Sequence, residues 1–368
     1  MHFERILVFC SLAKMWLLEE CSAAGTGSCY CIAFVYLAKS CHSMNLASEF
    51  GDDRVFNTPL TEQGIVGFAI GAAFEGMRPV AEVQFADYVY PAFDQLVNEA
   101  AKARFRAGVN AKGQSCGGLV VRMPCGGVGH GTSSQHYDKL RDGLTRSQVH
   151  CRRFCVRCAF DHTNSHRYHS QSPESLFTHI PGLRVVMPRG PAQAKGLLLA
   201  AIASNDPVVF MEPKILYRAA VEYVPTEAYE IPLSKAEIVK PGKDITIISY
   251  GTPLYTCSNA IEKAEADFGC QIELIDLRTI YPWDRPTIIE SVKRTGKAIV
   301  VHESMTNSGV GAEVAATIQE TCFLNLEAPV ARVCGWSTHM GLIYEVSQSS
   351  FPSVMNSADC YSDLTSQT

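Results

Sequence analysis

Apolar and polar residues alternate regularly from Met44 onward, and this pattern predicts a first α/β domain over residues 44–223. A glycine-marked apolar helix is predicted to begin near Glu62, with Thr58 or Thr61 able to cap it. After it, the pattern predicts strands at 79–85, 118–123, 183–189 and 207–213 and helices at 90–107 and 191–204. Such alternation of strands and helices favours a doubly wound sheet.

Residues 224–243 are predicted to link this domain to a second α/β domain over 244–345. Its predicted strands are 245–250, 272–276, 298–302 and 328–334, and its predicted helices are 253–268, 285–295 and 309–322. The alternation favours a parallel sheet with right-handed crossovers.

Three segments lack this order: 1–43, 132–167 and 346–368. The first has no sustained helical or strand period, and the last is a polar, Ser-rich tail. The middle one is rich in Arg, His, Ser and Cys, and it cannot bury enough apolar surface to offset the entropy of ordering it. We therefore interpret 132–167 as an unstructured insert.

Composition narrows the class of protein further. The chain has 368 residues, 47% of them hydrophobic and 19% charged, with a net charge of -5, which suggests a globular protein of two domains. The mild acidity gives no basic face for nucleic acid. The longest apolar runs, at 6–18 and 29–38, fall short of the roughly 20 residues of a membrane span, and no presequence is visible.

Glu62 is the first candidate for chemistry. A carboxyl that hydrogen-bonds a ring nitrogen of an aminopyrimidine favours its imino tautomer, which can then take a proton from a thiazolium carbon. Phe85 and Tyr88 would stack on or border that ring, and Gln84 would bond it. The alternatives are a glutamate that only stabilises the helix dipole, aromatic residues that only fill the core, and a glutamine that satisfies a strand end.

Five runs of sequence carry a resemblance to a known family: TPLTEQG, AEVQFADYVYPAFDQLVNEAAK, YHSQSPE, EPKILYRAA and IDLRTIYPWD. They resemble the beta subunit of the thiamine-diphosphate-dependent decarboxylating component of branched-chain 2-oxo acid dehydrogenases, over 44–131 and 168–345. The resemblance implies a thiamine-diphosphate-binding, pyrimidine-type doubly wound domain followed by a transketolase C-terminal-type α/β domain. It implies oxidative decarboxylation of branched-chain 2-oxo acids and reductive acylation of lipoamide.

The resemblance also implies partners and a location. The chain would assemble with an alpha subunit in an α2β2 heterotetramer, which in turn binds a lipoyl-bearing acyltransferase core. The cofactor would be shared between subunits, with Mg²⁺ held mainly by the alpha subunit. Branched-chain amino acid catabolism of this kind would place the chain in the mitochondrial matrix.

Carried over residue by residue, the resemblance makes Glu62 the pyrimidine glutamate, with Leu60, Gln84, Phe85 and Tyr88 around the cofactor. His169 would assist acyl transfer to the lipoyl group, and its residue type suits proton transfer near neutral pH. A potassium ion would be held at the matching positions Gly117, Leu119, Val120, Ala201 and Asp206.

Departures from the family leave other interpretations open. The segments 1–43, 132–167 and 346–368 replace family sequence, including a glutamate implied to relay protons. We hypothesise that they are noncoding sequence read as protein or the product of a faulty gene model. The chain would then be a non-catalytic remnant that keeps only its dimerisation surface. A zinc module at Cys155, Cys158, His162 and His166 is a further alternative.

Overall fold

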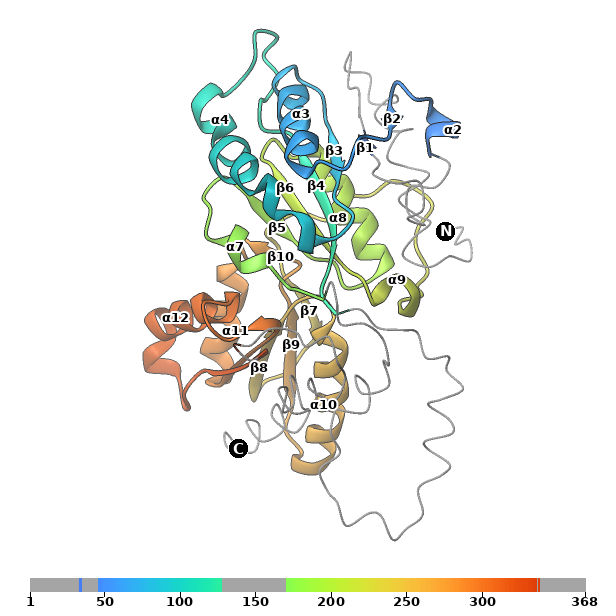
Figure 1. Cartoon of the computed structure of the whole chain (residues 1–368). Helices are drawn as coiled ribbons and strands as arrows, with labels where there is room; N and C mark the ends of the chain where they lie inside the picture. The colour runs from blue at the N-terminus through green and yellow to red at the C-terminus, as the bar shows by residue number, and fades with distance from the viewer. Residues whose placement is uncertain (1–32, 35–45, 128–169, 336, 338–368) are drawn as a thin grey trace. The chain divides into compact units, whose positions relative to one another are not determined.

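The computed structural model describes residues 33–34, 46–127, 170–335 and 337 (Figure 1). These residues divide into two compact units. The first comprises the described residues up to Cys125 together with Gln171–Lys235 and Arg278–Asp284. The second comprises the described residues of Gly126–Ser170, Ala236–Leu277 and the described residues from Arg285.

The first unit is built on a seven-stranded sheet in the order β10-β5-β6-β4-β3-β1-β2. Its strands are β1 (Ala33–Phe34), β2 (Val55–Phe56), β3 (Val80–Glu82), β4 (Val120–Cys125), β5 (Arg184–Val186), β6 (Val208–Pro213) and β10 (Thr279–Tyr281). Its helices are α2 (Leu46–Phe50), α3 (Glu62–Phe74), α4 (Ala101–Ala107), α7 (Glu174–Thr178), α8 (Pro191–Ala203) and α9 (Leu216–Ala219). All neighbouring strands are parallel except β10 and β5.

Three strands of this sheet lie outside the predicted strands. The expectation that 1–43 contains no regular element is wrong at Ala33–Phe34, because β1 lies between β2 and β3. The sequence predicts no strand at β2 or β10, yet β2 pairs parallel with β1 and β10 pairs antiparallel with β5. Each of the three is only two or three residues long, which is too short to show a period of two.

The predicted helix at 90–107 is divided into three parts. A 3₁₀ turn, η2 (Tyr90–Ala92), is followed by a π-helical segment, η3 (Gln95–Ala100), and then by α4. Pro91 lies inside the first turn, where its missing N–H costs no helical hydrogen bond. The apolar period predicted the helical region but not the change of helical pitch.

Both faces of the first sheet are covered. One core cluster joins Val80, Val120, Val208 and Phe210 of the strands to Leu197 and Ile202 of α8. Side chains alternate between faces along a strand, so Ala81, Val121 and Val209 point to the opposite side, where α3 contacts β3. Burial on both faces is what a doubly wound sheet requires.

The second unit has a five-stranded sheet in the order β12-β11-β8-β9-β7. Its strands are β7 (Glu237–Lys240), β8 (Ile245–Ser249), β9 (Ile272–Asp276), β11 (Ala298–Met305) and β12 (Ala331–Gly335), and its main helices are α10 (Pro253–Phe268), α11 (Arg285–Thr295) and α12 (Val310–Cys322). The four parallel strands were predicted. The antiparallel edge strand β7 was not, since it lies in the predicted linker 224–243.

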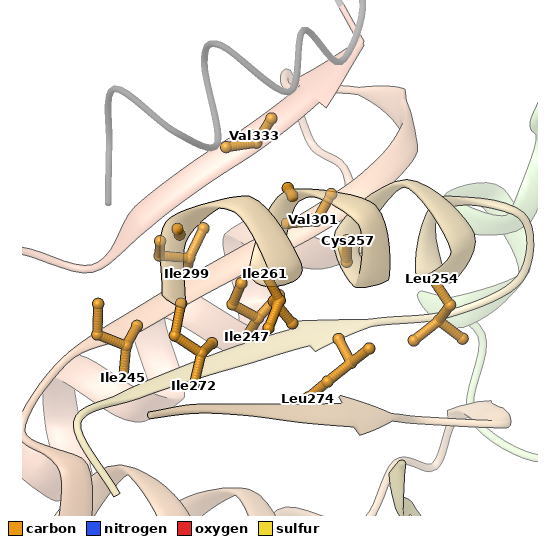
Figure 2. Packing of buried hydrophobic residues seen from close by; sticks show 12 residues of the cluster. Ile245, Ile247, Leu254, Cys257, Ile261, Ile272, Leu274, Ile299, Val301 and Val333 are labelled. Carbon is orange, nitrogen blue, oxygen red and sulfur yellow. The ribbon is translucent and has the colours of Figure 1, made fainter. Parts of the chain in front are cut away.

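Figure 2 shows the core on one face of this second sheet. Ile245, Ile247 and Leu274 of the strands meet Cys257 and Ile261 of α10. On the opposite face, Thr246 exchanges hydrogen bonds with Ser291 and Thr295 of α11 at 2.7 and 2.8 Å. This face is mixed, because Ile248 of β8 and Ile288 and Val292 of α11 are also buried.

Candidate cofactor site

The first turn of α3 places Glu62 at the carboxyl edge of the first sheet. Thr61 is the N-cap, with φ -147° and ψ 91°, and its hydroxyl accepts a hydrogen bond from the Gly64 N–H at 3.4 Å. Because α3 connects parallel strands, it runs against them, and its N-terminus lies where the strands end. Glu62 is half-buried there, and Leu60 beside it is 67% exposed.

Gln84 and Phe85 follow β3 at the same edge. The Oε1 atom of Gln84 is buried and has no hydrogen-bond partner among the described residues. An unpaired buried amide oxygen costs on the order of 1–3 kcal/mol, so its position favours a donor beyond the described residues. Phe85 caps the 3₁₀ turn η1 (Ala86–Tyr88), and its ring lies 6.2 Å from that of Tyr88.

A buried charge cluster lies on the strands beneath these residues. Arg122 of β4 donates from Nε to Glu212 of β6 at 2.8 Å, and its Nη1 lies 3.4 Å from Glu82 of β3. Tyr217 donates to Glu212 at 2.6 Å. Burial alone would lower the pKa of Arg122, but Glu212 and Glu82 raise it above its usual value. Burial and then Glu212 raise the pKa of Tyr217 well above 10.0.

This charge cluster is not among the features predicted from the sequence. A signal was present, since Glu82, Arg122 and Glu212 each interrupt an otherwise apolar strand. A charged residue inside a buried strand is rare unless it is paired, so three of them predict a mutual contact.

The residues at this edge fit a thiamine diphosphate pyrimidine. Gln84 supplies an acceptor that has no partner within the described part of the chain, Glu62 a carboxylate, and Phe85 and Tyr88 aromatic faces. His169 lies outside the described residues, as does the proposed zinc set Cys155, Cys158, His162 and His166. Within the described ranges, no group of three or more His, Cys, Asp or Glu residues could hold a metal ion.

The residues predicted to hold potassium do not offer a free carboxylate to a cation, because Asp206 is already paired. Asp206 accepts hydrogen bonds from Arg184 Nε and Nη2 at 3.0 and 2.9 Å and from Arg104 Nη1. Burial alone would raise the pKa of Asp206, but hydrogen bonds from Arg104 and Arg184 lower it below its usual value. The carboxylate charge is therefore already compensated by two guanidinium groups.

Backbone carbonyls around Asp206 accept hydrogen bonds as well, although each keeps a second lone pair. Arg78 donates to the carbonyl of Ser204 and, at 2.7 Å, to Asn205 Oδ1. The carbonyls of Leu119 and Ala201 accept from the N–H groups of Val208 and Ser204 at 2.8 and 3.2 Å. Gly117 and Val120 are the remaining members of the predicted potassium set. The three arginines around this turn are Arg78, Arg104 and Arg184, and their positive charge repels a further cation.

Two family descriptions match the chain. The pyrimidine binding domain of transketolase matches residues 38–142 and 136–220, and the C-terminal domain of transketolase matches residues 234–351. A solved split-gene transketolase, described as an inactive beta4 tetramer, covers 98% of both chains with a TM-score of 0.67 at 18% identity. At that identity the likeness shows the fold alone, and it confirms the predicted α/β class.

Similar sequences assign the chain to a narrower family than the two domain descriptions do. The mitochondrial 2-oxoisovalerate dehydrogenase subunit beta of Chaetomium thermophilum is 62% identical over 87% of this chain, and that of Dictyostelium discoideum is 52% identical over 82%. The chain spans 60% of the length of the first and 72% of the second. It belongs to the family of 2-oxoisovalerate dehydrogenase beta subunits, which confirms the resemblance read from the sequence.

Proposed function

We propose that this chain acts as the beta subunit of a branched-chain 2-oxo acid dehydrogenase, the 3-methyl-2-oxobutanoate dehydrogenase (2-methylpropanoyl-transferring). It would decarboxylate branched-chain 2-oxo acids and acylate lipoamide reductively. The observation that carries the proposal is the buried Oε1 of Gln84, which has no hydrogen-bond partner among the described residues and lies at the sheet edge that also holds Glu62. An aminopyrimidine offers the amino donor that Gln84 lacks and the ring nitrogen that Glu62 would bond.

Each residue has a defined part in this proposal. When bound, thiamine diphosphate supplies the electron sink for loss of CO₂ from the 2-oxo acid. Glu62 holds a proton at the ring nitrogen and thereby sets the tautomer. Gln84 accepts from the amino group, Phe85 and Tyr88 border the ring face, and Leu60 extends into solvent beside it. His169 would donate or accept the proton that moves when the lipoyl disulfide is opened.

An alpha subunit would complete the site. After Glu62, α3 carries no charged residue through Phe74, yet Phe68 is 57% exposed and Gly71 has nothing near the position of a Cβ atom. An apolar helix face of this kind marks a surface that another chain covers. We assign the face to the alpha subunit of an α2β2 assembly, which would also hold Mg²⁺ and the diphosphate.

Other parts of the proposal rest on the relatives. The subunits from Chaetomium thermophilum and Dictyostelium discoideum are named mitochondrial, so we assign this chain to the mitochondrial matrix and to a complex with a lipoyl-bearing acyltransferase core.

No helix of the described part of the chain is long and apolar enough to cross a membrane. We propose a pyrimidine-binding domain based on 44–223 and a C-terminal domain based on 244–345, with β7 added to the second sheet and β10 joined to the first. Nothing in the comparisons favours a non-catalytic remnant.

The test is co-expression with an alpha subunit of this family, followed by measurement of CO₂ release from 2-oxoisovalerate with and without thiamine diphosphate. We expect release that depends on the cofactor. His169→Ala is expected to lower acyl transfer to lipoamide more than decarboxylation measured with an artificial electron acceptor. An assembled complex that binds thiamine diphosphate but releases no CO₂ would contradict the proposal.

A further inference from the structure

Asp87 lies inside the aromatic turn η1, between Phe85 and Tyr88, and is the acidic residue of that turn. Its Oδ2 forms an ion pair with Lys214 Nζ at 3.0 Å, and its Oδ1 accepts a hydrogen bond from the N–H of Gln171 at 3.2 Å. Both carboxylate oxygens are therefore used, and they join three segments that are far apart in the sequence.

Lys214 also contacts the ring of Phe85. Its Nζ lies 4.6 Å from the ring centroid, within the range of a cation–π interaction. The backbone of Lys214 is fixed at the end of β6, because its N–H donates to the carbonyl of Cys125 at 3.0 Å. One ammonium group thus holds both the carboxylate and the aromatic ring of the same turn.

The ion pair is almost wholly removed from water. The side chain of Lys214 is 7% exposed and that of Asp87 is 5% exposed. A buried pair contributes little net stability compared with apolar residues, but loss of one partner leaves a costly buried charge. Such a pair is suited to fixing one arrangement of the turn rather than to strengthening the fold.

We propose that Asp87 and Lys214 are positioning residues that hold Phe85 and Tyr88 in register for the cofactor ring and tie this turn to the chain at Gln171. The inference rests on the proposed function, since it assigns the ring beside Phe85 to thiamine diphosphate. Asp87 and Lys214 touch no reacting atom in this scheme, and they act through the aromatic residues.

The experiment uses the co-expressed complex with the alpha subunit. Asp87→Asn keeps the acceptor for Gln171 but removes the charge, Lys214→Met removes the ammonium at similar length, and Asp87→Ala removes both contacts. The exposed pair Arg285–Glu313, 57% and 64% exposed, supplies the control Glu313→Gln. The readouts are the Kd for thiamine diphosphate by calorimetry, amide hydrogen exchange at Gln171, and kcat at saturating cofactor.

All three substitutions at the buried pair are expected to raise the cofactor Kd by about tenfold or more, whereas kcat at saturation changes less. Exchange at Gln171 should quicken in Asp87→Ala and stay slow in Asp87→Asn and Lys214→Met. If the complex with Asp87→Ala does not assemble, Asp87→Asn and Lys214→Met still test the proposal, because their new side chains are similar in size to the original ones. Values of Kd within about twofold of the control would overturn the proposal.

Failure of the proposed function gives a different result. A parent complex that binds thiamine diphosphate without releasing CO₂ contradicts the dehydrogenase activity, while the Kd and the exchange at Gln171 still decide the role of Asp87. A parent complex that binds no thiamine diphosphate overturns both proposals.

Discussion

The helices α3 and α10 occupy comparable places in the two units but differ on their outer surfaces. α10 is amphipathic: Leu254, Cys257 and Ile261 face the core, while Glu262 and Lys263 are exposed. α3 buries Ile65, Val66 and Ala69, yet its outer side presents Phe68 and Gly71 rather than charge. The outer side of α10 therefore carries charge, whereas that of α3 leaves an apolar face for another molecule.

The sheets beneath these two helices also differ in how they bury charged and polar groups. The first carries the charged cluster of Glu82, Arg122 and Glu212, with Gln84 unpaired at its edge among the described residues. The second sheet also buries a carboxylate, Glu273, but its partner Arg294 is 46% exposed. In the first sheet the guanidinium and both carboxylates are buried together, and the Gln84 amide oxygen has no partner among the described residues. Folding alone does not favour such a cluster, which is typical of a functional site.

The strongest test of this comparison is Glu62→Gln on α3. We expect decarboxylation by the complex to fall by about 10²- to 10⁴-fold, because an amide cannot exchange a proton with the pyrimidine. Assembly should persist, since a first-turn glutamate stabilises its helix by only about 0.3–1 kcal/mol. CO₂ release within a few-fold of the parent would remove Glu62 from the proposed role.

Arg122→Met tests the charged sheet. The substitution leaves Glu82 and Glu212 buried without their guanidinium, and we expect the first unit to lose about 3–5 kcal/mol of unfolding free energy. Thr246→Val, in the second sheet, removes neutral hydrogen bonds and should cost about 1 kcal/mol. Urea unfolding followed by hydrogen exchange in each unit measures both, and equal losses would contradict the contrast between the sheets.

A pH titration tests the second unit. His302 is fully buried between the carbonyl of Ser304 and the Cys334 thiol, at 3.0 and 3.2 Å, and burial lowers its pKa from 6.5 to about 4. Below pH 6.5 the unfolded chain takes up a proton that the folded chain does not. Stability of the second unit should therefore fall as the pH drops from 6.5 to 4, by about 3 kcal/mol in total.

The control for this titration is His302→Gln, which should remove that dependence over the same pH window. His179→Gln, at an exposed position of the first unit, should leave it unchanged. A pH dependence that survives in His302→Gln would assign it to another group.

The exposed face of α3 is tested by Phe68→Lys. We expect affinity for the alpha subunit to fall by about 10- to 100-fold, because a charge would be placed in an apolar contact. Phe68 also meets Phe56 edge-on at 6.3 Å, so the stability of the chain should be measured alongside. Tyr255→Lys on α10, where the residue is 44% exposed, should leave the affinity unchanged.

The smallest expected effect concerns potassium. Replacing KCl by choline chloride at equal ionic strength should produce no potassium-specific shift in the Tm of the complex, because Arg104 and Arg184 already neutralise Asp206. Asp206→Asn should cost about 1 kcal/mol, as expected for a partly exposed ion pair. A Tm that rises specifically with potassium would contradict the assignment of these arginines.

Sequence alone determined the elements whose periodicity is long and uninterrupted. The predicted bounds of α10, β9 and α11 agree residue for residue with the structure, and Thr61 was among the two predicted caps of α3. Each of these signals is local: an apolar face repeats over several turns, or a hydroxyl lies at a helix start. The residue types around Glu62 and Gln84 likewise suggested the cofactor site before any fold was known.

Only the tertiary structure decided the remaining features. β1, β2 and β10 are only two or three residues long and show no period, and their pairing with neighbouring strands defines them. The pairing of β7 with β9 likewise appears only in the fold. The contacts of Asp87 with Lys214 and of Asp206 with Arg104 join residues more than a hundred positions apart, and that of Asp206 with Arg184 joins residues 22 positions apart. Such pairings depend on which strand ends meet at one edge of the sheet, and this is a property of the whole fold.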